Sequence, residues 1–194
     1  MVHRRERLPP ARVTQGYSQA VRHRTLTPLF AGSNPATPAN YKEDFMNRPD
    51  KLHYYLNIAT TVSDRSTCLR RRYGAVIVKN DEIISTGYNG APRGCTNCID
   101  KNFCKRVSMK VKHNERYELC RAVHAEMNAL LSASRNECIG ATLYLSCKDD
   151  LGYVQGSDCC DICKKLIINA GIETVIIRDN ENEQRIYNVK EWSI

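Results

Sequence analysis

The sequence predicts an α/β domain of three layers, in which helices cover both faces of one mixed sheet. Two observations lead to this prediction. From residue 50 onward, short apolar runs of strand length alternate with segments of helical periodicity. The chain has 194 residues and 42% of them are hydrophobic, which is enough for one compact domain with a packed core.

The first ordered elements are a helix and a β-hairpin. Apolar residues recur at helical spacing at Leu52, Tyr55, Leu56, Ala59 and Val62. Asp50 precedes them and can cap the first turn. Two short apolar runs follow at 75–78 and 83–86, and the polar residues 79–82 between them predict the turn of a hairpin.

Residues 88–120 form a polar, cysteine-rich insertion with little periodicity. A loop of this length is unusual inside a compact domain, and a bound metal would explain it. Beyond the insertion, the sequence predicts a helix at 122–134, a strand at 141–146, a helix at 161–169 that stops at Gly171, and a strand at 174–177. This alternation of helices and strands is what indicates the layered sheet.

The first 45 residues differ from the rest of the chain. They are rich in Arg, Pro, Ala, Ser and Thr and show neither helical nor strand periodicity. They suit a transit peptide only in part, because the prolines fit badly, and a basic disordered arm is an alternative. We favour a translation start placed too early, with Met46 as the native start, since residues 32–39 resemble a translated transfer-RNA gene. The chain is therefore divided into a disordered or non-native extension, 1–45, and one folded domain, 46–194.

Charge and cysteine content narrow the class of protein. The formal charge is +8, and half of it comes from residues 1–45, so the folded part is only mildly basic. That charge fits an anionic small ligand as well as nucleic acid. No apolar run approaches the roughly 18–20 residues that a membrane span needs, and because the first thirty residues contain no apolar segment we do not expect a secretory signal. We expect a cytoplasmic protein whose ten cysteines are reduced thiols or metal ligands.

Two short motifs point to a catalytic zinc site. One is His124-x-Glu126 and the other is Cys160-x-x-Cys163, and each opens a predicted helix. Zinc in a catalytic site takes three protein ligands, here His124, Cys160 and Cys163, and leaves a fourth position for water. Glu126 is not needed as a ligand and can carry protons. Alone, the cysteine pair would equally suit half of a zinc ribbon or a redox pair.

Taken together, these motifs resemble the cytidine and deoxycytidylate deaminase superfamily, and its deoxycytidylate (dCMP) branch in particular. The resemblance covers about residues 50–180 and rests on the segments 74–78, 85–92, 124–129 and 160–171. Gly-Tyr-Asn-Gly at 87–90 and the cysteine-rich insertion favour the dCMP branch. Cys159 departs from the family motif, which has proline before the first cysteine of the pair, and this puts the local loop geometry in doubt but leaves the ligands intact.

The resemblance implies hydrolytic deamination of a cytosine nucleotide, dCMP to dUMP and ammonia, with one catalytic zinc ion. Glu126 would take a proton from the attacking water, deliver it to N3 of the ring and then protonate the departing amine. Asn89 resembles the family residue that hydrogen-bonds the nucleoside, although it also suits a turn before Gly90. Arg135 resembles a position near the substrate phosphate, although it also suits a cation at the end of the predicted helix.

Some members of the dCMP branch hold a second, structural zinc ion. By position, its ligands match Cys68, Cys98, Cys104 and Cys120. Cys95 and His113 are alternative ligands, and buried free thiols are the other interpretation. We expect Cys138 and Cys147 to be core residues beside a strand. The resemblance further implies a homo-oligomer, and relatives are controlled by nucleoside triphosphate effectors.

Two other functions stay open at this point. One is deamination of a base within a nucleic acid, such as transfer RNA. The other is a catalytically silent, zinc-stabilised nucleic-acid-binding module, against which Glu126 counts because a structural zinc site has no use for it. The scarcity of aromatic residues also gives no platform for stacking bases. The sequence leaves open which cytosine compound is the physiological substrate.

Overall fold

A computed structural model describes residues 48–112 and 115–193. They contain a five-stranded sheet with the strand order β2-β1-β3-β4-β5. Its strands are β1 (Arg72–Lys79), β2 (Glu82–Tyr88), β3 (Thr142–Lys148), β4 (Thr174–Arg178) and β5 (Gln184–Asn188). β3 and β4 run parallel, and every other neighbouring pair is antiparallel, so the sheet is mixed as predicted. The predicted boundary at residue 45, Met46 and His113 all lie outside the described residues.

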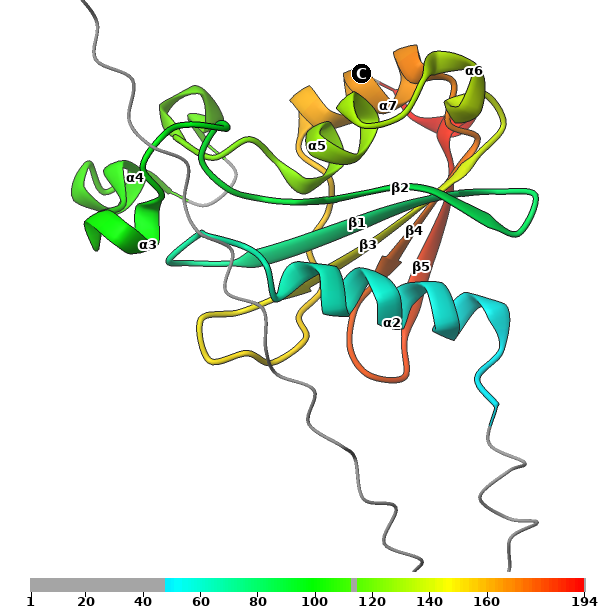
Figure 1. Cartoon of the computed structure of the whole chain (residues 1–194), viewed down its shortest axis with the longest axis horizontal. Helices are drawn as coiled ribbons and strands as arrows, with labels where there is room; N and C mark the ends of the chain where they lie inside the picture. Colours follow the sequence, from blue (N-terminus) through cyan, green and yellow to red (C-terminus); the bar gives the residue numbers. More distant parts are fainter. Residues whose placement is uncertain (1–47, 113–114, 194) are drawn as a thin grey trace, which may run out of the picture. The chain divides into compact units, whose positions relative to one another are not determined.

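Helices cover both faces of this sheet (Figure 1). Helix α2 (Lys51–Ser63) packs on one face, while α5 (Ala125–Leu131) and α7 (Asp161–Ala170) pack on the other. The connection from β3 to its parallel neighbour β4 passes through α7, because parallel strands need a crossover and cannot be joined by a tight turn. The predicted three-layer α/β architecture is confirmed.

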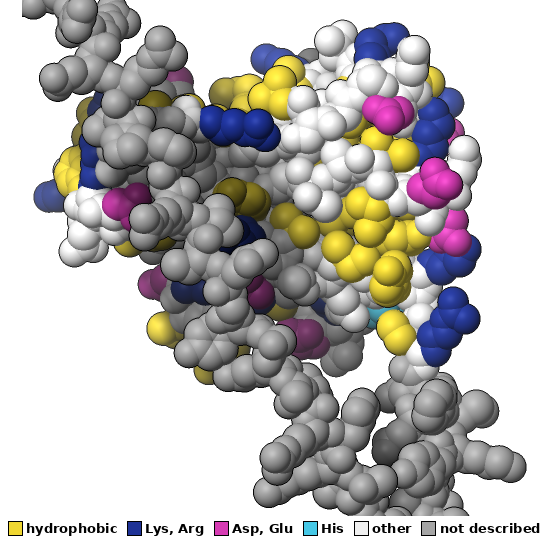
Figure 2. All heavy atoms as spheres, viewed as in Figure 1, with side chains coloured by type: hydrophobic (Ala, Val, Ile, Leu, Met, Phe, Trp, Pro, Cys, Tyr) yellow, Lys and Arg dark blue, Asp and Glu magenta, His cyan; other side chains and the backbone are white. Residues whose placement is uncertain are grey.

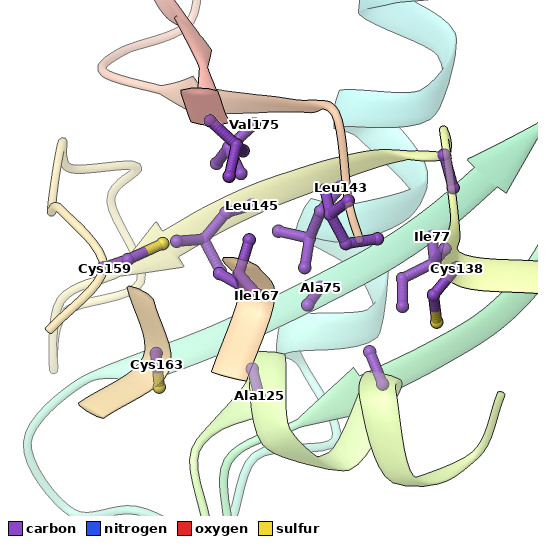
Figure 3. Close-up of a cluster of buried hydrophobic side chains, with 14 of the residues drawn as sticks. Ala75, Ile77, Ala125, Cys138, Leu143, Leu145, Cys159, Cys163, Ile167 and Val175 are labelled. Carbon is purple, nitrogen blue, oxygen red and sulfur yellow. The ribbon is translucent and has the colours of Figure 1, made fainter. Parts of the chain in front are cut away.

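Two apolar clusters hold the layers together. The first lies between the sheet and the helices α5 and α7, and it includes the fully buried Ile77, Leu145 and Ile167. Ala125 of α5 and Cys163 of α7 belong to the same cluster (Figure 3). The second cluster joins α2 to the opposite face of the sheet. The two helices that carry the sequence motifs are therefore fixed by core packing.

Local sequence accounts for the first helix and the hairpin. Asp50 caps α2, since its carboxylate accepts a hydrogen bond from the backbone N of His53 at 2.8 Å. Asn80 and Asp81 form the turn between β1 and β2, and both have the positive φ that a tight two-residue turn requires. The hydroxyl of Tyr55 donates to the Asp81 carboxylate at 2.7 Å and so ties this turn to α2. Both elements were predicted, and the strands of the hairpin are longer than expected.

Two glycines of the hairpin allow helices to approach the sheet closely. A Cβ atom at Gly87 in β2 would lie 2.3 Å from the carbonyl oxygen of Ala125 and from the amide nitrogen of Ala129 in α5. A Cβ atom at Gly74 in β1 would lie 2.0 Å from the carbonyl oxygen of Ala59 in α2. Because Cβ contacts under 3.0 Å essentially never occur, each helix rests on the bare backbone of a strand.

The cysteine-rich insertion, expected at 88–120, spans residues 91–122 in the structure and forms a closed loop. Gly90 and Val123 exchange two backbone hydrogen bonds, with N–O distances of 3.1 and 2.8 Å, so the two ends of the insertion meet. The insertion also contains short regular elements that its sequence did not predict, namely α3 (Cys98–Lys101), α4 (Lys105–Ser108) and the 3-10 turn η1 (Tyr117–Leu119).

Two further predictions need correction. The helix expected at 122–134 is shorter, because α5 begins after His124 and a separate helix, α6 (Arg135–Cys138), follows it. Ser134 caps α6 in a capping box with Glu137, so Arg135 opens a helix and does not end one. The interpretation of Arg135 as a cation at the end of the first helix is therefore wrong. Strand β5, at the edge of the sheet, was not predicted.

The described residues include no helix that is long and apolar enough to cross a membrane. On the part of the face that Figure 2 draws in colour, Lys and Arg side chains are interspersed with Asp and Glu.

Candidate active site and metal centre

The two sequence motifs meet at neighbouring helix ends. His124 is the N-cap of α5, and Cys160 is the N-cap of α7, with Cys163 in the first turn of that helix. Nδ1 of His124 lies 3.4 Å from Sγ of Cys160 and 3.3 Å from Sγ of Cys163. The three ligand atoms all lie within 4.8 Å of one another, and no other group of this kind occurs in the described part of the chain.

This geometry fits a zinc ion. Tetrahedral zinc, with bonds of about 2.0–2.1 Å to nitrogen and about 2.3 Å to sulfur, holds those two atoms about 3.6 Å apart, close to the observed distances. A hydrogen bond from Cys163 lowers the pKa of Cys160 to about 4, with a further contribution from His124. Cys160 is thus a thiolate at neutral pH, which is the form that binds metal.

Glu126 lies in the first turn of α5, two residues after His124. Its side chain is only 3% exposed, and it lines the same pocket as His124 and Cys160. Burial raises the pKa of Glu126, and the nearby His124 opposes that rise. A carboxyl group with a raised pKa holds a proton more readily, which suits a residue that both takes and gives protons.

The pocket beside these residues carries positive charge. Arg70 and Arg71, just before β1, and Arg106, in the insertion, all line it. None of the three forms an ion pair with a carboxylate of the described residues. Tyr73 and Tyr117 supply aromatic walls. The arrangement suits an anionic ligand with a planar ring.

The two predicted substrate-binding residues lie in different places. Asn89 lines the pocket and is 6% exposed. Its Oδ1 accepts hydrogen bonds from Ser66 Oγ at 2.6 Å and from Tyr73 N at 2.8 Å, and its Nδ2 donates to the carbonyl oxygen of Arg71 at 2.9 Å. These bonds leave one amide hydrogen available to a ligand. Arg135 is exposed on α6 and is not among the residues that line the pocket.

Sequence reasoning did not single out the arginines of this pocket or Tyr117. The signal for Arg70 and Arg71 was present, since they belong to a run of three arginines whose last member, Arg72, begins β1. The ring of Tyr117 meets the ring of His124 edge-on, with centroids 5.3 Å apart and an interplanar angle of 79°. No sequence signal marks Tyr117, because this contact depends on how the insertion folds.

The four cysteines predicted to bind a second metal ion line one small cavity. They are Cys68, Cys98, Cys104 and Cys120, and the cavity volume of about 10 Å³ suits a single ion or water molecule. Their sulfur atoms are not mutually within 4.8 Å in the described structure, so an ion would have to draw them together. The backbone N–H of Arg70 donates to Sγ of Cys68 at 3.5 Å, a contact that strengthens when the sulfur is a thiolate. Cys95 is exposed and does not line this cavity.

The remaining cysteines belong to the core. Cys138 and Cys147 are buried, as predicted. Cys159, which stands where the family motif has proline, is also buried and packs in the same cluster as Ala125 (Figure 3). It does not belong to the group of ligand atoms around His124. The departure from proline therefore leaves the candidate metal ligands in place.

Comparisons with known proteins agree with this geometry. Residues 49–178 match the family described as the cytidine and deoxycytidylate deaminase zinc-binding region. The deoxycytidylate deaminase of Mycobacterium phage D29 is 42% identical over 136 residues, which cover 68% of this chain and 96% of the phage protein. The deoxycytidylate deaminase of Schizosaccharomyces pombe is 32% identical over 178 residues, which cover 87% of this chain.

The chain spans about half the length of the Schizosaccharomyces pombe protein, 52%, and 38% of the deoxycytidylate deaminase of Saccharomyces cerevisiae. Among solved structures, the apo dCMP deaminase of cyanophage S-TIM5 is similar, with 27% sequence identity and a TM-score of 0.49. That similarity covers 70% of this chain and 87% of the cyanophage chain.

Proposed function

Because the chain belongs to the cytidine and deoxycytidylate deaminase family, we propose that it is a zinc-dependent hydrolase that converts dCMP to dUMP and ammonia. The observation that carries this proposal is the cluster of His124, Cys160 and Cys163 beside the buried Glu126. A purely structural zinc site would need a fourth protein ligand and would have no use for a buried carboxyl group. The catalytically silent alternative is therefore not favoured.

The proposed chemistry assigns the metal and the proton transfers to different residues. His124, Cys160 and Cys163 would hold zinc, which supplies a Lewis acid that makes water acidic enough to attack at neutral pH. Glu126 takes a proton from the attacking water and delivers it to N3 of the cytosine ring. It then takes the remaining proton from the oxygen now bonded to C4 and gives it to the amine, so that the C4–N bond breaks, the C4 carbonyl forms and ammonia departs. The near-complete burial of Glu126 keeps bulk water from replacing it in these transfers.

The charge of the pocket supports a nucleotide over a nucleoside as the substrate. We assign the 5′-phosphate to Arg70 and Arg71, because both line the pocket without a carboxylate partner among the described residues. The remaining amide hydrogen of Asn89 is available to the nucleoside. Arg135, the phosphate contact suggested by the family resemblance, is exposed outside the pocket and is not proposed for this role.

We also propose a second, structural zinc ion held by Cys68, Cys98, Cys104 and Cys120. Two observations support it: the four side chains line one cavity of ionic size, and a backbone N–H already donates to one of the sulfur atoms. Such an ion would order the insertion, which forms one wall of the catalytic pocket.

Self-association is a further part of the proposal. Leu131 of α5 and Ile162 and Leu166 of α7 are exposed on the helical layer, and exposed apolar side chains on one layer favour a homo-oligomer. Control by a nucleoside triphosphate and a cytoplasmic location stay predictions from the family resemblance and from the sequence.

The test is ammonia release from dCMP, deoxycytidine and cytosine in single-stranded RNA, each with the zinc-loaded protein. We expect turnover of dCMP and much less of the other two. Arg71→Gln should lower kcat/KM for dCMP by about 10–100-fold, the loss expected for a charge-assisted hydrogen bond, and should leave deoxycytidine turnover nearly unchanged. Arg135→Gln is the matched control and should alter neither. Faster turnover of RNA than of dCMP would make the protein a nucleic-acid deaminase.

A further inference from the structure

Arg106 of α4 is a buried cation without an acidic partner. Its side chain is part of a residue only 7% exposed, and no carboxylate of the described residues forms an ion pair with it. Arginine is almost never fully buried unless it is paired, since moving its charge out of water is costly. No carboxylate of the described residues lies within ion-pair distance to offset this cost.

The guanidinium group is nevertheless held in place. Nη2 donates to the carbonyl oxygens of Lys112 at 3.0 Å and Glu115 at 2.5 Å. The central guanidinium carbon lies 4.6 Å from the centre of the Tyr117 ring, and that ring packs edge-on against His124. Nε, in contrast, is buried and has no hydrogen-bond partner in the described structure. The Nε–H group of Arg106 is thus a hydrogen-bond donor that is fixed in position without an acceptor among the described residues.

Arg106 lines both the catalytic pocket and the four-cysteine cavity of the described residues. A negative charge that develops among the cysteines would therefore be felt by this guanidinium.

Zinc bound by four thiolates creates such a charge. The ion carries two positive charges and the ligands four negative ones, which leaves a net charge of about −2 in a site where Cys98 is buried and the other three cysteines are partly buried. Ligand thiolates are commonly stabilised by N–H donors outside the ligand shell. The positive guanidinium of Arg106 and the net negative charge of the metal site would therefore offset each other.

We propose that Arg106 is the counter-cation of a metal ion bound by Cys68, Cys98, Cys104 and Cys120. This inference rests on the second metal site of the proposed function. Through Tyr117, the same guanidinium also forms the wall against which His124 packs. Arg106 therefore contributes both to the charge balance of the cysteine site and to the shape of the catalytic pocket.

The first experiment measures zinc affinity at the cysteine site alone. Cys160→Ser removes the catalytic ion, so that zinc remaining on the full-length chain reports the second site. In this background Arg106→Met should weaken zinc binding about 10–100-fold in competition with a chromophoric chelator, the usual effect of losing a group that supports metal ligands. Arg106→Lys should lose less, because it keeps the charge. Arg93→Met removes the same charge from an exposed position of the insertion and should have no effect.

The second experiment uses the sign of a stability change. With zinc bound, Arg106→Met should lower Tm, because it leaves the net negative charge of the metal site without a counter-cation. In a Cys98→Ser background, where no metal site can form, Arg106 is an unpaired buried cation and Arg106→Met should raise Tm or leave it unchanged. A residue that merely fills space would lower Tm in both backgrounds.

The outcomes separate the proposals. Unchanged zinc affinity in Arg106→Met would overturn the role of Arg106 as a counter-cation but not the metal site itself. If the same variant selectively lost dCMP turnover, Arg106 would instead be a substrate-binding residue. A Cys160→Ser protein that holds no zinc would overturn the second site and the role of Arg106 together. Neither result bears on dCMP deamination, which the substrate panel tests on its own.

Discussion

Gly87→Ala should damage catalysis from a position that contacts no substrate. The new Cβ would lie 2.3 Å from two backbone atoms of α5, and because contacts under 3.0 Å are not tolerated, the helix must retreat by about 0.7 Å. The helix cannot escape by rotating a side chain, since both atoms belong to its backbone. Overpacking of this kind costs about 1–3 kcal/mol of folding free energy. A shift approaching 1 Å at His124 and Glu126, which α5 carries, should lower kcat by up to about 100-fold.

Gly74→Ala is the matched control, because its Cβ would press at least as hard on α2, on the other face of the sheet, with a closest distance of 2.0 Å. Both variants should lose stability in urea denaturation. Ammonia release is then measured at a temperature where each variant is folded, and kcat is expressed per folded molecule. Only Gly87→Ala should lose turnover, while Gly74→Ala should stay within a few-fold of the parent chain. Equal losses of kcat in the two variants would refute the argument that α5 is placed by direct contact with β2.

Three other predictions follow from the same structure. Glu126→Gln should retain zinc and nucleotide but lose at least the 10²–10⁴-fold in rate typical of a missing general acid–base group, and a variant that keeps a tenth of the activity would exclude Glu126 as the proton carrier. A chain that starts at Met46 should fold and turn over like the full chain, and an insoluble or inactive product would contradict the division at residue 45. The hydrogen bond from Tyr55 to Asp81 raises the pKa of Tyr55 to about 12, from an ordinary value near 10. The folded state therefore holds this proton more tightly, so the stabilisation is complete below pH 10 and is lost as the pH rises towards 12. Tyr55→Phe should remove that part of the alkaline loss in thermal melts, and an unchanged pH profile would contradict it.

The features that were predicted correctly depend on short stretches of sequence. Asp50 caps its own helix, and the cysteine pair opens the helix that it was expected to open. The hairpin follows from two apolar runs joined by a short polar turn. In each case the residues that decide the structure are neighbours in the chain, so periodicity and capping rules suffice.

The features that were missed depend on distant contacts or on a local signal that was overlooked. Ser134 and Glu137 form a capping box that is readable from the sequence, and it would have placed Arg135 at the start of a new helix. The burial of Arg106 beside two cavities carries no such signal, since a Lys-Arg pair in a polar loop normally faces water. β5 pairs only with β4 at the edge of the sheet, and its exposed Ile186 breaks the expected pattern of a buried strand.

The paired hydrogen bonds between Gly90 and Val123 also have an evolutionary consequence. Because this bridge holds the two ends of the insertion together, the length of the chain between them is not limited by the core, and each doubling of a flexible loop costs only about 0.6 kcal/mol. Mutation can therefore lengthen or shorten this segment while Cys160 and Cys163, which lie at the start of α7, stay in place. Since the same segment forms one wall of the pocket, substrate preference can diverge between lineages while the catalytic machinery is inherited unchanged.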